Sequence, residues 1–472
     1  MAHRPVFAGL LLLIASIGAG TGCSQAPRDG APAPKTDAPP EQDRAATTPT
    51  VAVPNAPASA SAPARPLRVI VGGDLLPHRP SLVTPAAIQG ALAPLGPLFG
   101  QADGVIANYE AATGDVDAKT QRLAYAAPKG WLASLPRTGI KAVTVANNHS
   151  CDLGEPGLVA TLDEAKQSGL VAIGGDDVDP WTPRVVATDE ASGKRVCAIG
   201  WTTLSNSEGA CSKGKHLAFA PLNGSGKGRI DCAFAKARAA KCDATIAIMH
   251  GGIEYVPQTT QVMDQAAHAA EAGADAVVVH HPHIASPVTV HGTKDGRNVP
   301  IFASIGNLVT NQGESWKPPM FPVLQENRRL VCVNGWTRLG VLADFTFAFD
   351  EKSGDGRHAD PPTAGRVMTH AKLDWGMHLL WITNEHAEDR SIAVPKIEAR
   401  LLDPEKDKAV IAKLQEDERG PVALFSDPCW FERPGAASDR DPRCTSTPPP
   451  GSVVAKRPAR EHKKTGKIRA AK

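Results

Sequence analysis

Short runs of apolar, mostly β-branched residues recur along the first two thirds of the chain and stop at glycines or polar residues. Runs of this kind are typical of buried strands. They cover residues 67–71, 104–107, 141–146, 171–173, 195–199, 244–249, 274–279 and 299–303. Between them, residues 155–168 and 261–272 have apolar side chains at helical spacing and end beside Gly169 and Gly273. This alternation of strands and helices predicts an α/β fold.

Beyond Gln312 the pattern changes to successive strands without intervening helices. Residues 330–332, 339–349 and 378–383 are predicted strands, separated by turn-rich segments typical of an antiparallel meander. Residues 403–416 form a predicted helix. We therefore expect the folded domain to cover residues 67–416, with no internal repeat.

Both ends of the chain lack the pattern of a folded core. Residues 26–66 contain 22 alanines or prolines among 41 residues and predict an extended linker after Cys23, over residues 23–66. Proline, serine and charged residues dominate 434–472, where we expect a disordered basic tail. Its last 17 residues hold eight Lys or Arg and one acid. A solvated end is the favoured interpretation of the tail, and contact with an anionic polymer or lipid surface is the alternative.

The N-terminus has the order of an export signal. His3 and Arg4 precede an apolar run over 6–17, and small residues over 18–22 lead to Cys23. The apolar run is short for a membrane span. The Thr-Gly-Cys ending resembles a bacterial lipobox, although Gly20 stands where leucine is usual. Residues 1–22 are therefore a predicted signal peptide and Cys23 a predicted lipidation site, which would make the chain an exported lipoprotein of the cell envelope, anchored to a membrane. The alternatives are a simple secretory signal and an uncleaved anchor.

Composition narrows the class of protein. With 472 residues, 42% of them hydrophobic and 21% charged, the chain is neither disordered throughout nor a multi-span membrane protein. The net charge of +2 gives no basic field for nucleic acid, and we expect no specific nucleic-acid partner. The sequence leaves the oligomeric state open.

Nine cysteines are present, and no CxxC pair among them supports a cysteine metal cluster. Because an exported chain meets oxidising conditions, some cysteines are expected to pair. Proximity in sequence suggests Cys211 with Cys232, and Cys429 with Cys444. Cys151 is predicted to be a buried structural cysteine.

Polar residues follow one predicted strand after another. These residues are Asp74, Asn108, Glu110, Asn147, Asn148, His149, His250, His280, His281 and His283. Since the carboxyl ends of strands in open α/β sheets converge on one crevice, five strands would direct these groups to one place. Each motif alone is commonly structural, and the convergence is what favours a metal site. Carboxylate, amide and imidazole donors without thiolate suit Mn, Zn, Fe or Mg. We expect the imidazoles of His281 and His283, which flank Pro282, to face one cation.

The same motifs, in the same order, resemble a known family. They are Gly73-Asp74, Asn108-Tyr109-Glu110, Ala146-Asn147-Asn148-His149 with Asp152 and Gly154, His250-Gly251-Gly252-Ile253-Glu254-Tyr255, Ala272-Gly273-Ala274-Asp275, His280-His281-Pro282-His283 and Ser304-Ile305-Gly306-Asn307 with Gln312. Over residues 67–312 the chain resembles the capsule-synthesis CapA family, associated with poly-γ-glutamate and similar to the calcineurin-like metallophosphoesterases. The resemblance implies a four-layer α/β/β/α sandwich, in which two sheets pack face to face between helices.

The resemblance also implies roles for individual residues. It makes His149 the general acid. It also implies that Glu254 and Asn307 orient substrate or ligands. The implied metal ligands are Asp74, Glu110, Asn148, His250, His281 and His283. Together they would hold one or two divalent ions.

Three positions depart from these families. Leu76 stands where metallophosphoesterases place a histidine, Glu110 where they place a bridging aspartate, and Val279 where the capsule family has glycine. His78, two residues beyond Leu76, is either a replacement ligand or an ordinary loop histidine. The number of metal ions therefore stays open.

The combined prediction is a protein that acts in the synthesis or handling of a capsular polymer such as poly-γ-glutamate. Its expected activity is metal-dependent hydrolysis of an amide or phosphoester bond. The alternative is a non-catalytic envelope component that binds or guides an anionic capsular polymer or its precursor, and a fold that has lost its metal is a third interpretation. The sequence shows no Walker-type loop for an ATP-driven ligase. Residues 205–228 are predicted as a surface loop, with a lid over the site as the alternative.

Overall fold

The computed structural model describes residues 64–77, 82–115, 125–207, 211, 215–322, 328–349, 371–384, 396–430 and 441–445. The predicted signal peptide, Cys23, residues 23–63 of the linker, His78 and the basic end of the tail lie outside the described residues. Within the described ranges, no helix has the length and hydropathy needed to cross a membrane.

The larger sheet has eight strands, seven of them in the order β16-β15-β14-β1-β2-β5-β6, while β13 pairs with β1 beside this path. The strands are β1 (Leu67–Leu75), β2 (Gly104–Tyr109), β5 (Ala142–Thr144), β6 (Val171–Ile173), β13 (Asn307–Val309), β14 (Leu339–Ala348), β15 (Lys372–Thr383) and β16 (Glu398–Leu401). Strands β1, β2, β5 and β6 are parallel, whereas β14, β15 and β16 add antiparallel neighbours. The predicted change to a meander beyond Gln312 is thus present in the structure.

The smaller sheet has six strands in the order β11-β12-β10-β9-β8-β7. They are β7 (Arg184–Asp189), β8 (Lys194–Thr202), β9 (Ala244–His250), β10 (Ala276–His280), β11 (Val288–Gly292) and β12 (Asn298–Phe302). The four central strands are parallel and the two edge strands are antiparallel. A separate short pair joins β3 (Ala112–Thr113) to β4 (Ala126–Ala127).

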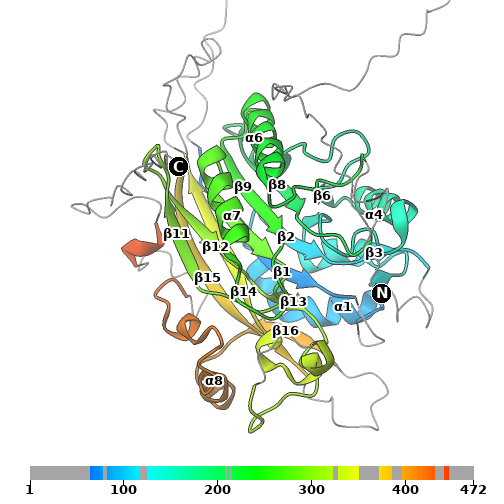
Figure 1. Ribbon diagram of the computed structural model, residues 1–472, viewed down its shortest axis with the longest axis vertical. Helices are drawn as coiled ribbons and strands as arrows, with labels where there is room; N and C mark the ends of the chain where they lie inside the picture. The colour runs from blue at the N-terminus through cyan, green and yellow to red at the C-terminus, as the bar shows by residue number, and fades with distance from the viewer. Residues whose placement is uncertain are drawn as a thin grey trace, which may run out of the picture. The chain divides into compact units, whose positions relative to one another are not determined.

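Helices cover the outer face of each sheet (Figure 1). Those on the larger sheet are α1 (Pro85–Leu92), η1 (Ala93–Leu95), α2 (Gly96–Phe99), η2 (Leu132–Thr138) and α4 (Gly154–Gln167), and those on the smaller sheet are α6 (Gly224–Ala239) and α7 (Thr260–Ala272). Three apolar clusters separate the layers: one between the sheets, one under α1 and α4, and one under α6 and α7. The four-layer α/β/β/α sandwich implied by the resemblance is therefore confirmed.

Alternation along the strands explains these three cores. Val71 of β1 lies in the cluster between the sheets, and its neighbour Ile70 lies in the cluster under the outer helices. The same division holds on β9, where Ile248 faces the other sheet and Met249 faces the helices. Because successive side chains point to opposite faces, a parallel strand covered on both sides must be apolar at nearly every position.

Some predicted elements differ from the structure. Residues 330–332 belong to a 3-10 helix, η3 (Arg328–Val333), instead of a strand. The predicted surface loop over 205–228 contains the start of α6, where the Asn223 side chain accepts hydrogen bonds from the backbone N–H groups of Ser225 and Gly226. A capping asparagine before the glycines begins this helix despite its weak apolar pattern.

The C-terminal region continues past the predicted boundary at residue 416. Before this boundary lie η4 (Gly335–Arg338) and α8 (Lys408–Gln415). Beyond it lie η6 (Val422–Ser426) and η8 (Pro442–Cys444). Cys429 and Cys444 are buried in the cluster between the sheets and form a disulfide, as predicted from their spacing. Residues 441–445 are thus part of the fold, although they fall inside the predicted tail.

Two further disulfides are described, Cys151–Cys211 and Cys197–Cys242. The predicted pairing of Cys211 with Cys232 is therefore wrong. Cys211 lies 60 residues from Cys151 in sequence, and the two meet only because the β8–α6 connection returns over the loop that follows β5. The prediction that Cys151 is a buried structural cysteine is confirmed.

Candidate metal centre

The inner faces of five parallel strands change from apolar to polar at their carboxyl ends. On β2, Ile106 lies between the sheets, and the alternation carries that face on to Asn108 and Glu110. On β9 and β10, Ile248 and Val278 lead in the same way to His250 and His280. Asp74 and Thr144 occupy the corresponding places on β1 and β5. Two sheets packed face to face thus direct polar side chains from both sides into one buried space.

Asp74 reaches this space because β1 is irregular near its carboxyl end. The β1–β2 register shifts between Val71 and Asp74, and the Asp74 N–H donates to the carbonyl of Gly306 over 3.1 Å. A Cβ on Gly73 would lie 2.1 Å from the Gly306 oxygen, so only glycine allows this close approach. The Gly73-Asp74 motif therefore lets β1 approach Gly306 closely and so positions the Asp74 carboxylate.

The Asp74 carboxylate is fully buried and has three side-chain partners. Its Oδ1 accepts from Asn108 Nδ2 at 2.8 Å and lies 3.0 Å from His280 Nδ1, while Oδ2 lies 3.1 Å from His283 Nδ1. Burial opposes ionisation of Asp74, but the hydrogen bonds from His280 and His283 outweigh it and hold the pKa of this carboxyl well below its usual range. Asp74 is therefore a carboxylate at neutral pH.

Glu110 is the least satisfied group of the centre. Its side chain is fully buried, and neither carboxyl oxygen has a hydrogen-bond donor among the described residues. Oε1 lies 3.7 Å from both His250 Nε2 and His283 Nε2. Burial, reinforced by the charges of Asp74 and Glu254, raises the pKa of Glu110 well above its usual range. A buried carboxyl without donors is unfavourable unless a cation compensates it.

Two groups of metal-ligand atoms meet at Glu110. One consists of Glu110, His250 and His281, and the other of Asp74, Glu110 and His283, with all ligand atoms of each group within 4.8 Å of one another. Glu110 is common to both, so its two oxygens could serve two neighbouring cations. It thus occupies the place of the bridging aspartate named in the resemblance.

His250 and Asn148 lie together beside Glu110. Asn148 Oδ1 is 2.8 Å from His250 Nε2, and Asn108 Nδ2 is 3.3 Å from His250 Nδ1. Burial, with the imidazole of His281 nearby, lowers the pKa of His250 well below its usual range. His250 is therefore neutral, which is the form that ligates metals.

The turn after β10 places His281 and His283 in different groups. Both residues have positive φ, 102° and 58°, in the region that non-glycine residues rarely adopt. The prediction that both imidazoles face one cation is therefore wrong, because His281 turns toward His250 and His283 toward Asp74. Burial disfavours charge on His283, but its hydrogen bond to Asp74 prevails and raises the pKa. Backbone strain of this kind is found preferentially at functional sites.

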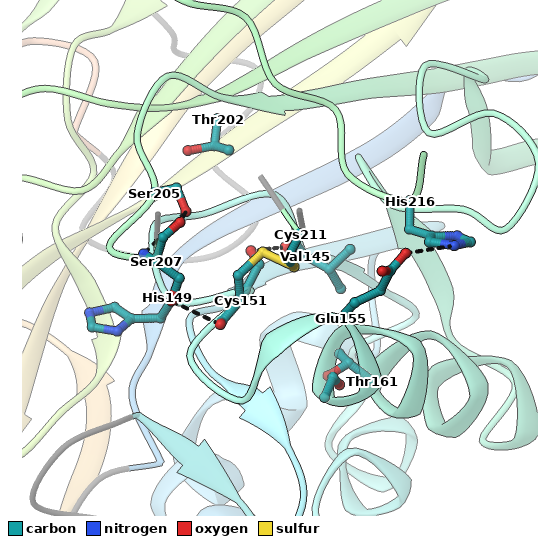
Figure 2. Close-up of a disulfide and its surroundings, with 12 residues drawn as sticks. Val145, His149, Cys151, Glu155, Thr161, Thr202, Ser205, Ser207, Cys211 and His216 are labelled. Carbon is teal, nitrogen blue, oxygen red and sulfur yellow. Dashed lines mark hydrogen bonds and ion pairs between the residues drawn. A yellow bond between two sulfur atoms is a disulfide. The ribbon is translucent and has the colours of Figure 1, made fainter. Parts of the chain in front are cut away.

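His149, the predicted general acid, lies at the edge of the centre. Its Nδ1 is 2.6 Å from Asp152 Oδ2, and the same oxygen accepts from the Tyr125 N–H at 2.8 Å. The ring of Tyr125 packs edge-on against the imidazole, with the ring centroids 4.2 Å apart. Figure 2 shows His149 close to the Cys151–Cys211 disulfide. The ring is thus oriented through Nδ1.

Asn307 and Glu254 differ in their relation to the centre. Asn307 is fully buried, its Oδ1 accepts from His283 Nδ1 at 3.0 Å, and its Nδ2 donates to the carbonyls of His283 and Thr337. It therefore orients His283 from behind. Glu254 is partly exposed and close enough for its charge to raise the pKa values of Glu110 and His283. Leu76, which departs from the pattern of the resemblance, is buried and offers no ligand atom.

Two further residues of the centre, Asn108 and His280, belong to the sequence motifs but were not among the predicted ligands. Asn108 connects Asp74, His250 and Thr144, whose Oγ1 donates to Asn108 Oδ1 at 2.8 Å. His280 fixes Asp74 through Nδ1, while its Nε2 has no hydrogen-bond partner among the described residues. Strand alternation could have found both, because each lies two residues beyond an inner-face apolar residue.

The residues present fit a divalent cation. In the part of the chain that the structure describes, Glu110 supplies two buried oxygens that accept no hydrogen bond, and His250 is neutral. The other metal-ligand groups are carboxylate and imidazole, a set suited to Mn, Zn, Fe or Mg. Asn108, His280 and Asn307 hold the ligand side chains from behind, as is usual around metal sites. The structure thus brings together every metal ligand proposed from the sequence.

Comparison with known proteins gives one family and two relatives. Residues 68–312 match the family model described as bacterial capsule synthesis protein PGA_cap. Over 169 residues the chain is 28% identical to the PGA biosynthesis protein CapA of Bacillus subtilis (strain 168), which covers 36% of this chain and 42% of that protein. Over 181 residues it is 26% identical to the capsule biosynthesis protein CapA of Bacillus anthracis, covering 38% and 42%. The match thus spans less than half the length of either relative.

Proposed function

Because this chain belongs to the bacterial capsule synthesis protein family and is similar to two proteins named CapA, we propose that it acts in the synthesis or handling of a capsular polymer. The polymer class we propose is poly-γ-glutamate, or a precursor of it, since one relative is named a PGA biosynthesis protein. The reaction we propose is metal-dependent hydrolysis of an amide or phosphoester bond.

One observation carries the proposal of hydrolysis. Glu110, buried without a hydrogen-bond donor among the described residues, joins two groups of ligand atoms. The hydrogen-bonded pair His149–Asp152 lies at the edge of the same centre. A purely structural cluster has no need for a buried carboxyl without donors, which costs free energy of folding. A cation bound there would act as a Lewis acid on the scissile group.

The chain's own residues have separate tasks in this proposal. Asp152 accepts the hydrogen bond from His149 Nδ1, which leaves Nε2 as the atom that exchanges a proton with the leaving group. Tyr125 restricts the tilt of the imidazole by its edge-on contact. Asn108 and His280 keep Asp74 in place, and Asn307 does the same for His283.

The cysteines support the proposal that the protein is exported to the cell envelope. Three disulfides lie among the described residues, and such bonds persist in oxidising compartments. Together with the signal-like N-terminus and Cys23, they favour a lipid-anchored protein displayed outside the cytoplasm. The lipid anchor is part of the proposal.

Metal content and hydrolysis of the full chain test the proposal together. We expect one or two ions per chain after loading with Mn²⁺, Zn²⁺ or Fe²⁺, and loss of metal without unfolding in His281→Ala/His283→Ala. His149→Ala should keep its metal and lose hydrolysis of bis(p-nitrophenyl) phosphate and of poly-γ-glutamate. His268→Ala, which removes a surface histidine paired with Asp231, is the matched control. Absence of bound metal after loading would rule out a metallohydrolase.

A binding role is the second candidate, favoured by Leu76 in place of a ligand and by the eight basic residues in 456–472. It predicts that poly-γ-glutamate binds without being cut and that binding weakens with salt. Deletion of 456–472 should then flatten the salt dependence. Hydrolysis that needs both metal and His149 would contradict this role.

A further inference from the structure

The segment after β8, Thr203–Ser207, lies against the side of the candidate metal centre that holds His149; we call it the covering segment. The Thr203 N–H donates to the carbonyl of His250 at 2.9 Å, and the Asn206 N–H donates to the carbonyl of Asn148 at the same distance. Its main chain thus connects a predicted ligand of the smaller sheet with one that follows β5 of the larger sheet.

Asn206 brings its side chain to His149. Its Nδ2 lies 3.5 Å from His149 Nδ1 and 3.4 Å from Nε2, so the amide lies beside the ring, nearly equidistant from both nitrogens. Asn206 is exposed, whereas His149 keeps only 7% of its surface. An exposed amide next to a buried imidazole stands where an incoming substrate would meet both.

The disulfide Cys151–Cys211 joins the two loops that meet here. Cys151 comes two residues after His149, and Cys211 comes four residues after Ser207. Ser207 Oγ also donates to the Cys151 carbonyl at 2.9 Å, as Figure 2 shows. Both sulfurs are nearly inaccessible, since Cys151 is 1% and Cys211 7% exposed. The chain is therefore covalently attached to the loop that carries His149 at Cys211, four residues beyond the covering segment.

We propose that the Cys151–Cys211 disulfide holds the covering segment against His149, and that Asn206 thereby positions the substrate beside this imidazole. The role of Asn206 rests on the proposed hydrolase function. Its Nδ2–H can donate to an oxygen of an amide or phosphoester next to the leaving group, and its Oδ1 can accept from the N–H of a substrate amide. Asn206 is a positioning residue, and His149 carries out the proton transfer.

The test compares the full chain with three variants, all loaded with Mn²⁺. They are Asn206→Ala, Cys151→Ala/Cys211→Ala and the matched control Cys197→Ala/Cys242→Ala. The control removes a disulfide from the opposite end of β8, since Cys197 pairs in register with Thr245 at the start of β9. Diethyl pyrocarbonate, which acylates accessible neutral imidazoles, is the probe, and peptide mass spectrometry measures its rate of reaction at His149.

We expect His149 to react about tenfold faster in Asn206→Ala and in Cys151→Ala/Cys211→Ala than in the parent, with unchanged metal content and with the control equal to the parent. Equal rates in all four proteins would overturn the covering role. If the Cys151→Ala/Cys211→Ala variant fails to fold, Asn206→Ala still decides whether the covering segment shields His149, because it changes only an exposed side chain. The part played by the disulfide is then decided by the rate at His149 in the parent before and after reduction of the disulfide, and an unchanged rate would overturn it.

Hydrolysis of bis(p-nitrophenyl) phosphate tests the positioning role separately. We expect kcat/KM to fall about tenfold in Asn206→Ala and to recover in part in Asn206→Gln, which restores the amide. An active parent and an equally active Asn206→Ala would overturn the positioning role and leave the proposed hydrolase intact. An inactive parent would overturn both, whereas the reactivity of His149 would still report on the covering segment.

Discussion

Glu110 shows how a single residue can be unfavourable for folding and necessary for a site. Its carboxyl is fully buried, has no donor among the described residues and lies 3.7 Å from two imidazole nitrogens. Burying such a group disfavours folding, and a bound cation is the natural compensation. The same side chain should therefore weaken the metal-free protein and stabilise the metal-bound one.

Replacement of Glu110 by glutamine should separate these two effects. Without metal, Glu110→Gln should unfold at the same temperature as the parent or higher, because a buried ionisable group is removed. Added Mn²⁺ should raise the melting temperature of the parent and not that of the variant, since a ligand stabilises only the state it binds. Calorimetric melts with and without Mn²⁺ make the comparison. An equal metal-induced shift in both proteins would contradict a ligand role for Glu110.

His280 should act on metal affinity through Asp74. Loss of its hydrogen bond to Asp74 Oδ1 in His280→Ala should weaken Mn²⁺ binding by about 10- to 100-fold, as is usual for residues that orient metal ligands. Titration calorimetry with Mn²⁺ measures the effect. His291→Ala, which removes a partly exposed histidine paired with Glu271, is the control. Unchanged affinity in His280→Ala would show that Asp74 keeps its place without this partner.

At the scale of elements, the strands of the larger sheet also carry a buried ionic group away from the metal centre. Asp344 of β14 accepts from Arg68 of β1 at 2.7 and 3.0 Å and lies 3.0 Å from His378 of β15. Burial opposes ionisation of Asp344, but the hydrogen bonds from His378 and Arg68 outweigh it and lower the pKa to about 2. Three adjacent strands are thus linked by one carboxylate.

This carboxylate should make stability depend on pH. Because the pKa of Asp344 is lowered from 3.8 to about 2, its contribution is complete above about pH 4 and is lost as the pH falls toward 2. The difference corresponds to roughly 2 kcal/mol of unfolding free energy. Urea unfolding between pH 2 and 6 should therefore show a shallower dependence in Asp344→Asn than in the parent. Glu416→Gln, from an exposed pair with Lys413, should leave the dependence unchanged.

On the scale of the whole molecule, disulfides attach segments that have little core of their own. Cys429–Cys444 fastens the C-terminal segment beside β15, where the Met377 N–H donates to the Cys429 carbonyl at 2.9 Å. The bond closes a loop of 15 residues. Loops of this length correspond to about 3 kcal/mol of stabilisation, because the cross-link restricts the unfolded chain.

Removal of this bond should therefore destabilise the molecule without affecting the metal centre. Cys429→Ala/Cys444→Ala should lose about 3 kcal/mol of unfolding free energy, measured in urea, and keep its metal content. Cys332→Ala, which removes the free cysteine of the described residues, is the control. A loss of metal in Cys429→Ala/Cys444→Ala would mean that the C-terminal segment supports the centre as well.

Local patterns of residues were enough to predict much of this molecule. Apolar runs predicted the parallel strands, because strands buried on both faces must be apolar throughout. The polar residues that follow these runs predicted the position of the centre, because parallel strands end at the same edge of a sheet. The order of the motifs, through the family resemblance, also predicted the four-layer fold and the ligand set that the structure brings together.

Contacts between distant segments depend on tertiary structure, which spacing along the chain does not encode. Cys151 and Cys211 meet across 60 residues, and nothing local distinguishes this pair from Cys211 and Cys232. Whether His281 and His283 share one cation depends on the positive φ of both residues. The sequence gives no sign of this conformation, because neither position is a glycine. The role of Glu110 as the common member of two ligand groups likewise arises only when side chains from both sheets enclose it. The sequence by itself thus determined which residues enter the centre, and packing of the two sheets decided which of them touch.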